Sequence, residues 1–261
     1  MKKRVRIPQA YIKDLLEEKV RLYNTAAFVE SDPVSIPHLF SKKEDIEVAG
    51  LLAATIAWGN RISILRNGRR LMELMGDVPH DYVLNHSKQD LSRLRTYVHR
   101  TFNGSDCAYF VTSLKNIYRN HGGLESAFTA AKGARLKECI LHFRDIFFSL
   151  PHNARTEKHV SDPSKKSAAK RLCMFLRWMV RSDRKGVDFG IWKSIPSYEL
   201  MLPLDVHTGN VSRRLGLLKR KQNDWQAVEE ITAVLRTFDP VDPVKYDFAL
   251  FGMGVNQDLE K

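Results

Sequence analysis

Apolar side chains recur along this chain at the three- and four-residue spacing of amphipathic helices. This spacing predicts short helices between residues 86 and 160 and longer helices over residues 15–23, 41–56, 62–75, 167–181, 206–218, 224–238 and 243–254. The helix over 41–56 is apolar nearly all round, so we expect it to be buried. Because alternating β patterns are scarce and no internal repeat is visible, the sequence predicts an all-α fold.

Turn-forming segments separate the predicted helices. Residues 32–37 contain two prolines, Gly59-Asn60 interrupts an apolar run, and residues 155–166 are polar and basic. Ser41 and Glu44 have the spacing of a capping box at the start of the second helix. We expect residues 1–261 to form one unit with two helical lobes around a central cleft. One lobe comprises about 1–40 and 165–261, and the other comprises 41–164.

The composition is that of an ordinary globular protein. Of the 261 residues, 43% are hydrophobic and 28% are charged, which is too apolar for a disordered chain. No apolar run reaches the length of a membrane span, and the basic N-terminus leads into Ile7-Pro8 rather than an apolar signal core. We therefore expect a cytoplasmic monomer that does not bind membranes.

The three cysteines limit the chemistry that the chain can carry. Cys107, Cys139 and Cys173 cannot all pair, and no Cys-x-x-Cys motif occurs. This count argues against a disulfide framework, a four-cysteine zinc site and a four-cysteine iron–sulfur cluster. We expect neither a metal nor a cofactor.

Basic residues outnumber acidic ones, and they are unevenly distributed. There are 42 Lys and Arg residues against 30 Asp and Glu residues, which gives a formal charge of +12. Half of this excess lies between Ser161 and Gly186, where eight basic residues stand against two acidic ones. Such a cluster favours a polyanionic partner.

The helix predicted over 167–181 carries the first candidate for chemistry. One stripe of this helix contains Lys170, Met174, Arg177 and Arg181. The positive charges of Arg177 and Arg181 disfavour the ammonium form of Lys170. The neutral amine is the form that can attack a carbonyl-like carbon. A solvated basic face explains the same spacing, and on spacing alone it is the simpler interpretation.

Asp205 is the second candidate. It ends the apolar run Leu202-Pro203-Leu204 and precedes a helical pattern, so it is well placed as an N-cap. A carboxylate at such a position in a cleft is also suited to stabilising a cationic transition state or assisting proton transfer. The two roles are compatible.

Several segments resemble the helix-hairpin-helix (HhH-GPD) DNA glycosylase superfamily. Residues 202–208, Leu-Pro-Leu-Asp-Val-His-Thr, are similar to the segment around its catalytic Asp, and residues 51–62 to its early buried helix and turn. Residues 239–254 are similar to the helix beneath the catalytic Asp. Residues 170–177 are similar to the lysine-bearing helix of the archaeal 8-oxoguanine glycosylases. Most of the chain also resembles an uncharacterised bacterial family with the same signatures.

The resemblance implies a base-excision repair glycosylase with AP-lyase activity that removes an oxidised purine similar to 8-oxoguanine from DNA. Lys170 would attack the anomeric carbon, and Asp205 would stabilise the oxocarbenium-like charge. Asn60 and Arg61 would fill the gap left by the extruded base. An aromatic side chain would stack on that base, and the candidates are Trp58, Trp178, Trp192 and Phe189. The protein would associate with the nucleoid when bound to DNA.

The implied contacts with the DNA backbone come mainly from the basic cluster. They are Lys165, Lys166, Arg177, Arg181 and Lys185, with His207 beside Asp205. The hairpin motif typical of the superfamily cannot be recognised in the sequence, and residues 185–190 are its nearest counterpart. This departure makes Lys185 a rival of Lys170 for the catalytic lysine, although a helix would hold Lys170 more rigidly.

Two alternatives remain open. A non-catalytic DNA- or RNA-binding protein on the same scaffold would keep the basic cleft without forming a covalent intermediate. A basic structural protein of an RNA assembly would use Lys170 only for its charge. Because a fold does not imply a function, only the behaviour of the site can separate them.

Overall fold

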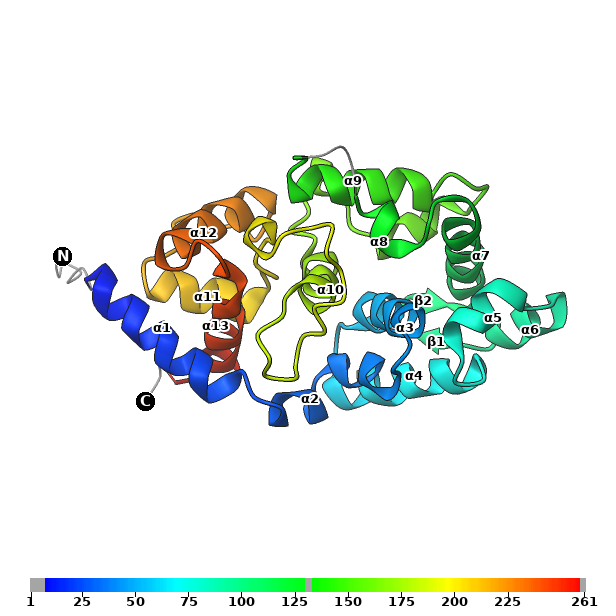
Figure 1. The fold of residues 1–261 in the computed structure, drawn as a ribbon, viewed down its shortest axis with the longest axis horizontal. Coiled ribbons are helices and arrows are strands. Elements are labelled where there is room, and N and C mark those ends of the chain that lie inside the picture. Colours follow the sequence, from blue (N-terminus) through cyan, green and yellow to red (C-terminus); the bar gives the residue numbers. More distant parts are fainter. Residues whose placement is uncertain (1–7, 130–132, 259–261) are drawn as a thin grey trace.

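The computed structural model describes residues 8–129 and 133–258. The N-terminal part contains two α-helices and two short 3-10 helices, namely α1 (Gln9–Tyr23), α2 (Ala27–Ser31), η1 (Pro33–Ser35) and η2 (Pro37–Leu39). Next come α3 (Lys43–Ile56), α4 (Arg61–Leu74), α5 (Pro79–Asn85), α6 (Lys88–Leu94), α7 (Gly104–Asn120), α8 (Leu124–Ala127) and α9 (Leu136–Phe147). Figure 1 shows α3 to α9 grouped at one end of the elongated molecule.

The C-terminal part contributes the remaining helices. They are η3 (Ala154–His159), η4 (Pro163–Lys165), α10 (Lys170–Val180), η5 (Ser197–Glu199), α11 (Val206–Arg214), α12 (Trp225–Phe238), η6 (Pro243–Lys245) and α13 (Tyr246–Val255). Within the described residues, the strands β1 (Val98–His99) and β2 (Phe102–Asn103) form one short antiparallel pair. The predicted all-α class is therefore confirmed. No helix in the described ranges has both the length and the apolar character needed to cross a membrane.

Two buried helices lie at the centre of the molecule. Helix α3 is buried from Ile46 to Ile56, as its apolar pattern predicts, and α10 is buried from Leu172 to Val180 and packs on it. Helix α13 packs on both α1 and α11. In Figure 1, α10 lies between the group α1, α11, α12 and α13 on one side and the group α3 to α9 on the other.

Several helices begin or end at other residues than expected; for example, α1 begins at Gln9 and α11 ends at Arg214. Two of the differences concern the starts of α3 and α10. Helix α3 begins at Lys43 with no side-chain cap, so the predicted capping box of Ser41 and Glu44 is wrong. Helix α10 begins at Lys170 rather than at residue 167, because Ala169 has a left-handed backbone conformation with φ 47°. Lys170 is therefore the first residue of its helix, not part of the interior of a longer one.

The segment between α10 and α11 has no α-helix. Residues 182–204 form turns and the short η5. Residues 185–190, the nearest sequence counterpart of a hairpin, therefore do not lead into a second helix before Asp205.

Candidate active site

A cavity of about 600 Å³ lies where the ends of several segments meet. Its walls come from the residue before η1, the turn between α3 and α4, the first residues of α10 and α11, and the last turns of α13. The lining residues that concern us are Asp32, Trp58, Arg61, Lys170, Arg171, Asp205, His207 and Phe251. The two residues that the sequence singled out for chemistry, Lys170 and Asp205, thus face the same space.

The position of Lys170 is set by the turn that precedes it. Ser167 forms a β-bridge with Asp224, and the Trp225 N–H donates to the Lys166 carbonyl at 3.3 Å. The left-handed conformation at Ala169, which is unfavourable for a residue with a Cβ, then turns the chain into α10. As a result, Lys170 lines the cavity with 28% of its side chain exposed.

Asp205 is the N-cap of α11, as the sequence predicts. One carboxylate oxygen, Oδ1, accepts a hydrogen bond from the Thr208 N–H at 2.9 Å. The other, Oδ2, lies 3.9 Å from the Lys170 Nζ. The cap therefore fixes the orientation of the carboxylate and leaves one oxygen directed at the lysine.

Asp32 is a second carboxylate of the cavity, and sequence analysis missed it. It is almost fully buried, and its Oδ1 accepts a hydrogen bond from the Val34 N–H at 3.0 Å. Burial raises the pKa of Asp32, while the Val34 hydrogen bond and the nearby charges of Arg177 and Lys170 oppose that rise. In the sequence, Asp32-Pro33 indicated only a break in the chain.

Beyond Lys170 the cavity narrows to a space of about 30 Å³ that reaches Asp247. Asp247 is buried and forms an ion pair with Arg177. Burial raises the pKa of Asp247 to about 6; the Arg177 charge opposes this rise, and the Asp205 charge adds to it. Three carboxylates, Asp32, Asp205 and Asp247, thus line a space that also contains Lys170.

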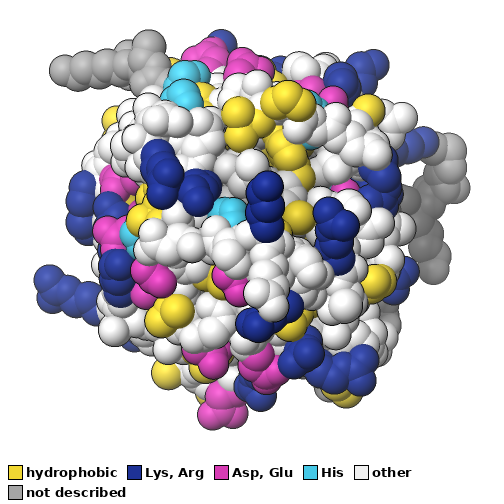
Figure 2. All heavy atoms as spheres, turned by 90° about the vertical axis from the view of Figure 1, so that its right-hand side faces the viewer, with side chains coloured by type: hydrophobic (Ala, Val, Ile, Leu, Met, Phe, Trp, Pro, Cys, Tyr) yellow, Lys and Arg dark blue, Asp and Glu magenta, His cyan; other side chains and the backbone are white. Residues whose placement is uncertain are grey.

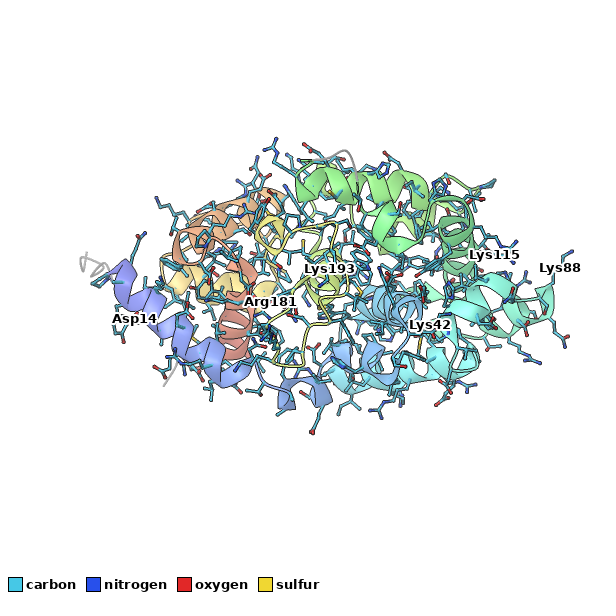
Figure 3. All side chains as sticks on the ribbon, viewed as in Figure 1. Asp14, Lys42, Lys88, Lys115, Arg181 and Lys193 are labelled. Atoms are coloured by element: carbon cyan, nitrogen blue, oxygen red, sulfur yellow. The ribbon has the colours of Figure 1, made fainter. Side chains whose placement is uncertain are left out.

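Arg177 and Arg181 do not lie on an exposed face. Arg177 is 3% exposed and Arg181 is 2% exposed. Arg177 pairs with Asp188 and Asp247, and Arg181 pairs with Asp183, Asp188 and Asp242 at 2.7 to 3.0 Å. Figure 3 shows Arg181 beside α13 in the interior. The expectation that these two arginines contact DNA phosphates is therefore wrong.

The same ion pairs change the electrostatic argument about Lys170. The sequence suggested that two unpaired arginines behind Lys170 would disfavour its ammonium form. Instead, carboxylates from three other segments neutralise both guanidinium groups, and both groups also lie over the Phe248 ring, at 4.4 and 5.3 Å from its centroid. These arginines tie α10 to α13 and to the segment that follows α10.

Among the four aromatic candidates, only Trp58 lines the cavity. The guanidinium of Arg100 lies 4.6 Å from the centroid of the Trp58 ring, which is a cation–π distance. Trp178 and Trp192 are buried in the core. Phe189 packs against His38, with ring centroids 4.3 Å apart. Trp58 is therefore the candidate that remains available to a ligand.

The two residues expected to fill the gap of an extruded base lie at the start of α4. Asn60 is exposed, and its side chain accepts a hydrogen bond from the Ser63 N–H as the N-cap. Arg61 lines the cavity, and its guanidinium lies 5.7 Å from the centroid of the Phe251 ring. Arg61 therefore faces the cavity, whereas Asn60 is not among the residues that line it and has a structural role as the cap of α4.

The remaining candidates lie at different distances from the cavity. His207 is exposed in the first turn of α11 and lines the cavity. Lys165 and Lys166 are exposed in the turn that leads to Lys170. Lys185 is exposed beside Gly186 and does not line the cavity. Of the two rival lysines, the geometry favours Lys170.

Arg171 brings a positive charge into the wall of the cavity. Its guanidinium donates hydrogen bonds to the carbonyls of Thr55 and Lys158. Burial lowers the pKa of Arg171 to about 10, so this side chain stays protonated at neutral pH. Within the part of the chain that the structure describes, it forms no ion pair with a carboxylate. The wall at Arg171 is therefore suited to an anionic group.

The protein is therefore all-α, with the Lys170–Asp205 pair in a cavity that Trp58 also lines. No group of three or more His, Cys, Asp or Glu side chains in the described residues is arranged to hold a metal ion. Comparison with protein-family models matches residues 32–256 to the family described as "Protein of unknown function (DUF2400)", and the chain belongs to this family. No curated protein and no solved structure matches the chain.

Proposed function

We propose that this protein is a DNA glycosylase with AP-lyase activity that acts through a Schiff base on Lys170. The observation that carries the proposal is the pairing of the Lys170 amine with the Asp205 carboxylate, 3.9 Å apart in a cavity of about 600 Å³. Base excision through a Schiff base requires an amine nucleophile and is assisted by a carboxylate fixed beside it. The resemblance of residues 202–208 and 170–177 to the HhH-GPD superfamily assigns the same two residues.

The chemistry follows from the two side chains. A damaged nucleotide leaves the duplex and enters the cavity, where Trp58 offers an aromatic face to the base. The Lys170 amine, having lost a proton, bonds to C1′ as the glycosidic bond breaks, and the base departs with the bonding electrons and gains a proton. Asp205 stabilises the positive charge that develops on the sugar.

The lyase step uses the same lysine. Opening of the sugar ring gives an imine between Lys170 and C1′. Loss of a proton from C2′ then expels the 3′ phosphate, which cleaves the strand, and water releases the lysine. No metal or cofactor enters these steps. The oxidised purine is the base class that the resemblance implies.

Borohydride trapping tests the proposal, because it reduces the imine to a stable covalent complex. Duplexes carrying 8-oxoguanine or an abasic site should be trapped by the wild type and not by Lys170→Gln. Asp205→Asn should still bind DNA but react at least about 100-fold more slowly, which is the usual scale for losing a group that acts on a developing charge or proton. Lys185→Gln is the matched control and should be trapped normally.

Two results would contradict the proposal in different ways. Trapping that survives Lys170→Gln and disappears in Lys185→Gln would move the nucleophile to the segment after α10. Failure to trap any lesion in a panel, with DNA binding retained, would favour a non-catalytic binding protein on this scaffold.

A further inference from the structure

Two basic segments that are far apart in the sequence lie together beside the cavity. The first is the turn with Lys165 and Lys166 before α10, and the second is the loop 219–223 between α11 and α12. The Trp225 N–H donates to the Lys166 carbonyl at 3.3 Å, and Ser167 pairs with Asp224 in a β-bridge. The end of the loop is therefore fastened to the turn that positions Lys170.

The loop is also fastened to the helix that Asp205 caps. The Asn223 side-chain amide donates to the Asp205 carbonyl at 3.0 Å, and Arg213 donates to the Asn223 side chain at 2.6 Å. A Cβ at Gly209 would lie 2.7 Å from the Asn223 Oδ1, so a larger residue there would displace the Asn223 side chain. These contacts hold the loop beside the first turns of α11.

Four lysines of these segments are exposed to solvent. Lys166, Lys219 and Lys221 are exposed and form no side-chain ion pair within the described ranges. Lys165 is 74% exposed, with its Nζ 3.9 Å from a carboxylate of Asp162. Arg220, in contrast, is committed to Asp224 at 2.5 and 2.6 Å.

We propose that Lys165, Lys166, Lys219 and Lys221 form a lysine strip that binds the phosphate backbone of DNA beside the Lys170–Asp205 cavity. This inference rests on the proposed function and names the surface that holds its substrate. Lysines on flexible stems neutralise phosphates without reading the base sequence. In the superfamily that the chain resembles, a hairpin holds the DNA phosphates. Residues 182–204, where its counterpart would lie, contain no helix other than η5, so the strip would bind the phosphates instead.

The opposite end of the molecule offers a matched control surface. Figure 2 shows that basic side chains on the face at the α5–α6 end are mixed with acidic ones. Lys88 and Lys115 lie at this end, far from α11 and α12 in Figure 3. Replacing them removes the same charge from the protein as replacing two lysines of the strip.

The salt dependence of DNA binding tests the strip. Fluorescence anisotropy would be measured with an undamaged duplex and with a duplex carrying a reduced abasic site, which cannot be cleaved. Lys165→Gln/Lys166→Gln and Lys219→Gln/Lys221→Gln should each make the negative slope of log K against log[NaCl] shallower by about 2, because each lost phosphate contact removes about 0.9 from its magnitude. The control Lys88→Gln/Lys115→Gln should keep the wild-type slope. Circular dichroism melting would verify that all variants fold.

Equal slopes in both strip variants and the control would overturn the inference, as would a wild type that binds neither duplex. The proposed function is tested separately by trapping. Trapping by the wild type with equal slopes would contradict the strip alone. Reduced slopes in the strip variants without any trapping would support the strip and contradict the lyase.

Discussion

The buried carboxylate of Asp247 predicts an unusual dependence of stability on pH. Its pKa is raised from an ordinary value near 3.9 to about 6, chiefly by burial. Below about pH 4 the group is protonated in both the folded and the unfolded protein. Above about pH 6 it is ionised in both, and the folded protein must then hold a buried charge that Arg177 only partly compensates.

The magnitude follows from the difference between the two pKa values. A difference of about two pKa units corresponds to roughly 3 kcal/mol, as an order of magnitude for a fully buried group. The contribution of Asp247 to stability is therefore fully present below pH 4 and is lost as the pH rises through 6. Asp247→Asn removes the titrating group while keeping a side chain of nearly the same size.

Urea unfolding between pH 4 and 7.5 provides the assay. The free energy of unfolding of the wild type, relative to that of Asp247→Asn, should fall by roughly 2 kcal/mol from pH 4 to pH 7, because the unfolded carboxyl is already about half ionised at pH 4. Asp145→Asn at an exposed position serves as the control for losing one carboxylate. Parallel pH curves for the wild type and Asp247→Asn would refute the reasoning.

Three other perturbations give distinct results. Gly254→Ala would place a Cβ 2.9 Å from the Cβ of His207, so we expect it to lower the melting temperature and, by displacing α11, to weaken trapping. Burial acts to raise the pKa of Glu125, but hydrogen bonds from Lys43 and from the 193–194 backbone lower it to about 2. The wild type should therefore lose stability in urea unfolding as the pH falls from about 4.5 to 2, and Glu125→Gln should lose less over the same range. Trp58→Ala should weaken binding to a duplex with a flipped-out base by roughly 1–3 kcal/mol in a titration, and an unchanged affinity would exclude it as a stacking platform.

The sequence was most informative where a local rule determines the structure. The apolar run of α3 predicts its burial, and a carboxylate after Leu202-Pro203-Leu204 predicts the N-cap at Asp205. Both depend on neighbours along the chain. The meeting of Lys170 and Asp205 in one cavity was expected only through the resemblance, because spacing within one helix does not say what lies opposite.

The errors have the same physical origin. A helical stripe gives the direction of Arg177 and Arg181 but not their partners, which come from residues after α10 and around η6 and α13. Those carboxylates turn an expected surface into a buried ion-pair network. Asp32 was missed for the same reason, since only tertiary structure brings a turn after α2 to the start of α10.

The assignment of the nucleophile can be tested most directly by locating the covalent bond. The wild type would be trapped with borohydride on a duplex containing an abasic site, digested with a protease, and analysed by mass spectrometry for the peptide that carries the reduced sugar. We predict that the adduct lies on Lys170, 3.9 Å from Asp205. An adduct on Lys185, on a lysine of the strip or on no lysine would contradict the central claim.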